Sequence, residues 1–97
     1  MSRAGIEAKL REVTEQIKRA RQELQVIEEQ LLHFRETADD ARVQALVDDS
    51  RLSAADAQEA QRHVEAHGRS RDRVAGTIVE LERSRDDLLD RLVLESR

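Results

Sequence analysis

Three histidines are the side chains in this sequence best suited to hold a metal ion. His63 and His67 are four residues apart, a spacing that puts two imidazoles on one face of a helix. In the antiparallel hairpin derived below, His33 lies level with the stretch between them, and Glu29, Glu36 and Glu59 are close by. Zinc or nickel accepts such nitrogen and oxygen donors. The candidate metal site is therefore His33, His63 and His67, weighed against a purely structural role for these side chains.

Arginines that follow the histidines form a candidate site for an anion or another ligand. These are Arg69, Arg71 and Arg73, and Gly68 beside them lowers the local helix propensity. No glycine-rich phosphate loop accompanies them. We expect Glu28-Glu29, at a similar level of the hairpin, to pair with these arginines.

Composition argues against catalysis and against several classes of partner. The chain has 97 residues without Cys or Pro, 39% are charged and 1% are aromatic, and the net charge is −4. A cysteine nucleophile is excluded, and no Ser/His/Asp arrangement can be placed. A nucleic-acid binder would show a basic excess. The uncharged apolar stretches are too short for a membrane span or a signal peptide. We expect a non-enzymatic cytoplasmic protein without a cofactor, a membrane or a nucleic-acid partner.

The helices that would position these side chains are indicated by the regular spacing of apolar residues along the chain. In the first half, apolar residues recur at alternating intervals of four and three, which is typical of a coiled-coil heptad. This first seam consists of Ile6, Leu10, Val13, Ile17, Ala20, Leu24, Ile27, Leu31, Phe34, Ala38 and Ala41. The residues between them are mostly strong helix formers. The pattern predicts a long amphipathic helix.

The second half repeats this period with a more polar seam. Its members are Ala57, Ala60, Val64, His67, Arg71, Val74, Ile78, Leu81, Arg85, Leu88 and Leu92. The two seams do not join in frame, so the heptad register breaks between them. Polar residues at core positions specify register or oligomer state at a cost in stability.

The segment Val47–Ser53 separates the two patterns and is rich in turn formers. Ser53 with Asp56 matches the S-x-x-D pattern of a helix start. We predict one all-α domain with helices at about 3–47 and 53–95 and a turn at about 48–52. A short connection favours antiparallel neighbours, so the fold class is an antiparallel two-helix coiled-coil hairpin. One continuous helix that pairs with a second chain is the structural alternative.

Two registers bring one seam against the other. The first pairs Ile6 with Leu92 and Phe34 with Val64, and it is preferred because it uses Ile6. The second instead pairs Ala38 with His67, so that small residues face large ones. The length of the turn fits both registers.

A hairpin of this size has a core only one side chain deep, which favours association with a further chain. Apolar residues are left over for this purpose near the turn and near the C-terminus. We expect a homodimer, in one version a four-helix bundle, whose interface comprises Val43, Leu46, Val47, Leu88, Leu89, Leu92, Val93 and Leu94.

The sequence predicts a coiled-coil module for protein–protein interaction or scaffolding, which binds itself and an unidentified protein. The acidic pair Asp48-Asp49 at the predicted tip resembles in outline the N-terminal arm of Gre-type transcript-cleavage factors. That resemblance covers topology only. The alternative function is a transcription regulator that binds a sigma factor or RNA polymerase through the hairpin, with a ligand at the arginines gating it. A metal-binding helical bundle is the second alternative.

Overall fold

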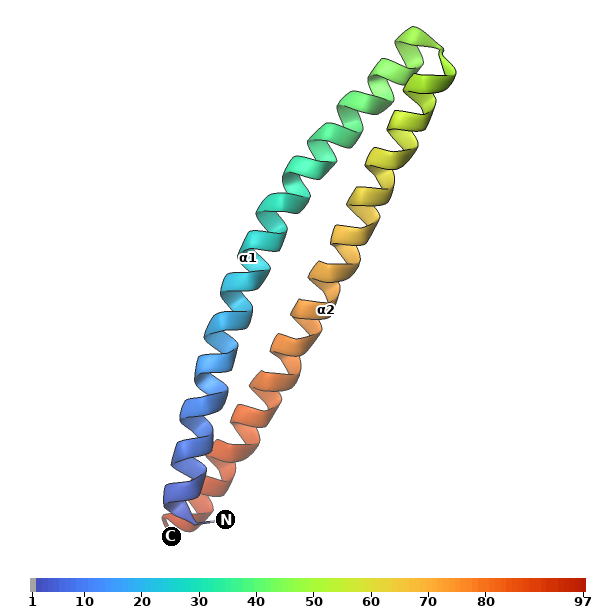
Figure 1. The fold of residues 1–97 in the computed structure, drawn as a ribbon. Coiled ribbons are helices and arrows are strands. Elements are labelled where there is room, and N and C mark those ends of the chain that lie inside the picture. Colours follow the sequence, from blue (N-terminus) through green and yellow to red (C-terminus); the bar gives the residue numbers. More distant parts are fainter. Residues whose placement is uncertain (1) are drawn as a thin grey trace. The chain divides into compact units, whose positions relative to one another are not determined.

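The computed structural model describes residues 2–97 and shows two helices packed against each other, joined by a short turn (Figure 1). Helix α1 spans Arg3–Asp48 and helix α2 spans Arg51–Glu95. No strand occurs in the described part of the chain. The predicted all-α hairpin is confirmed, and a continuous helix through the turn is excluded. The second helix begins two residues earlier than predicted.

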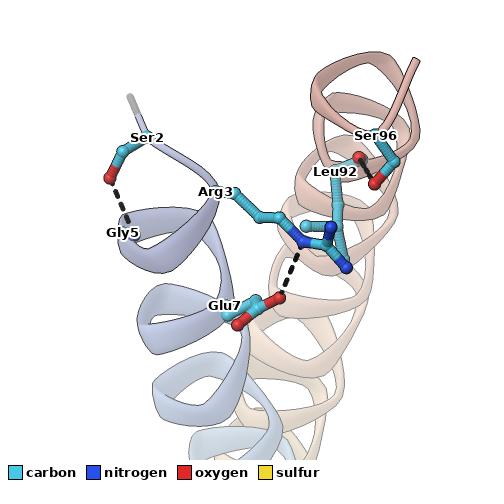
Figure 2. A network of polar contacts seen from close by, with 6 residues as sticks. All are labelled: Ser2, Arg3, Gly5, Glu7, Leu92 and Ser96. Carbon is cyan, nitrogen blue, oxygen red and sulfur yellow. Dashed lines mark hydrogen bonds and ion pairs between the residues drawn. The ribbon is translucent and has the colours of Figure 1, made fainter.

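Serine side chains form hydrogen bonds at the N-terminal end of α1 and at the C-terminal end of α2 (Figure 2). The Gly5 N–H donates to the Ser2 hydroxyl oxygen at 3.1 Å, which satisfies an amide that the first turn of α1 leaves without a carbonyl partner. The Ser96 hydroxyl donates to the Leu92 carbonyl oxygen at 2.9 Å. The first turn of α1 is also bridged by an ion pair of 3.1 Å between Arg3 and Glu7.

The chain reverses through Asp49 and Ser50. Asp49 has a φ of 49°, in the left-handed region that Asp tolerates better than most residues. The predicted helix start at Ser53 is wrong, because the cap is Ser50. Its hydroxyl oxygen accepts the Ser53 N–H at 3.1 Å, and its carbonyl accepts the Ala54 N–H at 3.1 Å. The S-x-x-S pattern that starts at Ser50 therefore acts before the S-x-x-D pattern that starts at Ser53.

Contacts divide the chain into two units, which we call the terminal unit (residues 1–24 with 74–97) and the central unit (25–73). In both, every predicted seam position is buried or half-buried. The core of the terminal unit comprises the buried Ile6, Val13, Ile17 and Leu88, against which Leu10, Leu81 and Leu92 pack. The heptad pattern therefore identified the buried face of both helices.

In the central unit, Leu31 and Ala38 are buried, and Phe34 fixes the register. The centroid of the Phe34 ring lies 5.6 Å from that of His63 and 4.2 Å from that of His67. Phe34 is thus level with Val64, which lies between the two histidines. The first register is correct for this unit. The second would place Phe34 opposite Arg71, about one helical turn beyond His67.

Candidate interaction surfaces

The three candidate metal ligands gather around Phe34 in the central unit. His63 stacks on the Phe34 ring with an interplanar angle of 16°, and His67 lies against it with a tilt of 35°. His33 meets the same ring edge-on at a centroid distance of 5.9 Å. The prediction that the three histidines lie at one level is confirmed. What the spacing of the histidines did not indicate is that an aromatic ring would be their common contact.

Among residues 2–97, no three His, Asp or Glu side chains are placed to hold a metal ion. The structure therefore does not assemble His33, His63 and His67 into the predicted metal site. The physical reason is that all three imidazoles pack on the ring of Phe34, and ring contacts do not direct their nitrogens to a common point.

Hydrogen bonding constrains the imidazole of His67 further. Its Nδ1 lies 2.9 Å from the backbone carbonyl oxygen of His63, and a carbonyl only accepts. Nδ1 therefore carries the proton, which in the neutral ring leaves Nε2 as an acceptor. His63 Nε2 lies 4.0 Å from a carboxylate oxygen of Glu59, one turn earlier in α2.

The candidate anion-binding arginines do not converge. Residues two apart on a helix point about 200° apart, so Arg71 lies on the seam while Arg69 and Arg73 lie on the outer side. Arg71 donates to a carboxylate oxygen of its neighbour Asp72 from Nε at 3.1 Å and from Nη2 at 2.9 Å. Arg73 donates to the Ser70 hydroxyl at 3.2 Å. Arg71 and Arg73 thus have partners within α2 itself.

Several large apolar side chains beside the turn are exposed to solvent. Val43, Leu46 and Val47 of α1 are 56%, 78% and 75% exposed. Leu52, at the start of α2, is 74% exposed and was not among the predicted interface residues. Its position outside both heptad seams was a signal that could have found it. We call Val43, Leu46, Val47 and Leu52 the tip patch.

The second predicted interface region, near the C-terminus, needs correction. Leu88 is buried and Leu92 packs on the same core, so neither is free for another chain. Both are seam residues, and the intramolecular contact with α1 uses them. Leu89, Val93 and Leu94 remain 44%, 55% and 66% exposed. We call these three residues the C-terminal patch.

The acidic pair at the turn has a local structural role. One Asp48 carboxylate oxygen accepts hydrogen bonds from the Gln44 side-chain amide at 2.6 Å and from the Ser53 hydroxyl at 3.0 Å. Asp49 supplies the left-handed residue of the turn. The resemblance to a Gre-type acidic tip therefore rests on residues that also stabilise the turn itself.

No protein-family model matches this chain, and neither the curated proteins nor the solved structures yield a match. Within residues 2–97, neither helix contains a stretch that is both long and apolar enough to cross a membrane.

Proposed function

We propose that this chain is a non-enzymatic coiled-coil module for protein–protein interaction, which associates with itself and presents the tip patch to a partner protein. The exposure of four large apolar side chains within ten residues of sequence is the observation that carries this proposal. Exposed apolar patches on proteins, where they are large, mark interaction sites.

The energetics of the tip patch suit a recognition surface. Full burial of a Val or Leu side chain contributes about 1.5–3 kcal/mol, and all four members of the patch keep more than half of their surface in solvent. A partner that covers them would therefore gain several kcal/mol from burial alone. The packing of the seam does not use these residues, so the fold itself does not explain their apolar character.

The tip patch can be tested without disturbing the fold. Leu46→Glu places a charge in the patch, whereas Leu32→Glu makes the same change at another exposed leucine of α1 that lies outside it. Both variants should fold, because both side chains point into solvent. We expect a partner captured by the wild-type chain from its native host to be lost with Leu46→Glu and kept with Leu32→Glu. Equal capture by both variants would contradict the proposed role of the tip patch.

The identity of the captured partner separates the proposal from its first alternative. RNA polymerase or a sigma factor, lost with Leu46→Glu, would favour the transcription regulator. A scaffold component lost with the same variant would favour the interaction module. One experiment therefore distinguishes the two functions, which the fold alone does not separate.

Self-association is a separate component and is tested on the C-terminal patch. Light scattering coupled to size-exclusion chromatography should give twice the 11.1 kDa mass of one chain. Val93→Asp should return the mass to that of a monomer, whereas Ser84→Asp, at an exposed position of α2, should not. A stable wild-type monomer across the accessible concentration range would contradict self-association.

A further inference from the structure

An open groove runs along one side of the central unit, with Phe34 at its centre. One hollow, of about 280 Å³, is lined by His33, Phe34 and His63 together with the carboxylates of Asp56 and Glu59. A second hollow, of about 500 Å³, shares His33 and Phe34 and adds Val26, Glu29 and His67. Because the two hollows share a wall, we treat them as one feature and call it the Phe34 groove.

The charge of the groove is of one sign. Asp56 and Glu59 lie in the first hollow and Glu29 lies in the second, while no Lys or Arg lines either hollow. This is notable in a chain with 17 basic residues. Glu59 lies 4.0 Å from His63 Nε2, and Glu29 accepts a hydrogen bond of 3.5 Å from the Gln25 amide. Neither of these two contacts involves an arginine.

The aromatic walls narrow the kind of cation that fits. Four planar rings, those of Phe34 and the three histidines, border the two hollows. A guanidinium group is planar, stacks on aromatic faces and binds carboxylates through a fork of N–H donors. A metal ion lacks a suitable set of ligands here, since no three are placed to hold one among the described residues.

We infer that the Phe34 groove binds arginine side chains of a basic segment in a partner protein. The inference rests on the proposed interaction function, for which it names a partner chemistry, but it concerns a surface other than the tip patch. Acidic carboxylates pair with the guanidinium at the rim, and the imidazole rings that pack on Phe34 stack against its plane. The same surface would bind a lysine side chain less well, because an ammonium group has no planar face to stack.

The probe is a short oligo-arginine peptide, compared with an oligo-lysine peptide of equal length at one low ionic strength. Titration into the full chain is followed by NMR on the ring signals of Phe34 and the three histidines. We expect saturable shifts of these signals, with oligo-arginine binding about threefold or more tightly than oligo-lysine.

Two conservative variants test the carboxylates against a matched control. Asp56→Asn and Glu59→Gln should each weaken binding of oligo-arginine by about threefold, and the pair by about tenfold, as partly exposed ion pairs do. Glu36→Gln removes the same charge from an exposed position of α1 that lines neither hollow, and it should leave the affinity unchanged. An equal loss with Glu36→Gln, or equal binding of both peptides, would show non-specific attraction and overturn the inference.

Self-binding is distinguished by concentration. If the ring signals move with the concentration of the chain alone and the peptide adds nothing, the groove is covered by a second copy and the inference is wrong. Failure of the peptide titration, with capture of a partner still dependent on Leu46, would reject the Phe34 groove and leave the proposed function standing.

Discussion

Replacing two helical glycines by alanine should raise the stability of this chain substantially. Gly68 and Gly76 lie within α2, and a Cβ atom built on either residue meets nothing within 4 Å. Each substitution therefore gains the helix propensity of alanine, about 1 kcal/mol, without a steric cost. The residues are eight positions apart, so the effects should be nearly additive and give about 2 kcal/mol for the double variant. For a chain of this size, that corresponds to an increase in Tm of roughly 8–16 °C.

Far-ultraviolet circular dichroism during thermal and urea unfolding, at one protein concentration, measures this gain. Ala66→Gly, at an exposed position of the same helix, should lower the free energy of unfolding by about 1 kcal/mol and so calibrate the propensity term. A loss of stability in Gly68→Ala or Gly76→Ala, with Ala66→Gly behaving as expected, would refute the reasoning. It would mean that another chain packs closely on the glycine in solution.

Three further predictions concern the turn and the core, and the same unfolding assay measures each. Asp49→Gly should raise the free energy of unfolding by about 0.5 kcal/mol, and Asp49→Val should lower it by about 1 kcal/mol. The reason is that a φ of 49° suits Gly and is unfavourable for a β-branched residue. A stabilising Asp49→Val would contradict this prediction. Ser50→Ala removes the side-chain cap of α2 and should cost about 1 kcal/mol, whereas no loss would mean that water or another group replaces the cap. Leu31→Ala should lower the free energy of unfolding by about 2–3 kcal/mol, while Leu32→Ala should change it by no more than about 0.5 kcal/mol. The reason is that the two leucines are 2% and 59% exposed. Similar losses at both positions would show that the seam is wrongly assigned.

The heptad spacing was sufficient to predict which side of each helix is buried, even where the residue type argued otherwise. Arg71 and Arg85 were assigned to the seam by position alone, and their side chains are 35% and 33% exposed in the structure. Periodicity succeeds here because a long helix can bury only one stripe, and the majority of apolar residues decides which one. The guanidinium groups of both arginines extend to acidic neighbours while their stems lie along the seam.

Local side-chain hydrogen bonds were harder to predict than the helices. Both Ser50 and Ser53 were followed three residues later by a polar partner, and the pattern alone does not decide which serine caps α2. The turn decides it, because the left-handed conformation of Asp49 ends α1 and makes Ser50 the next residue. Ser53 then donates its hydroxyl to Asp48 across the turn. Such a choice depends on the three-dimensional path of the chain over a few residues.

The sequence predicted that the three histidines lie at the same height along the hairpin, but it did not predict what their rings contact. Heptad register placed His33 beside the stretch between His63 and His67, and the structure confirms that placement. Coordination of a metal requires nitrogen lone pairs to converge, and no spacing along a helix specifies the rotation of a ring about its side-chain bonds. Phe34, the only aromatic residue of the chain, was the available signal that these imidazoles would pack instead.

The thin core of this hairpin links its stability to any binding along its sides. Phe34 is a seam residue that is only half-buried, so one ring serves both as core and as the floor of the Phe34 groove. A substitution at Phe34 would therefore lower stability and binding together and would not separate the two. Asp56 and Glu59 lie on the exposed rim of α2 and take no part in the seam. In a protein with one layer of core side chains, substitution of such rim residues can change binding affinity without a loss of stability. The side chains on the floor of the groove cannot be changed in this way, because they also hold the two helices together.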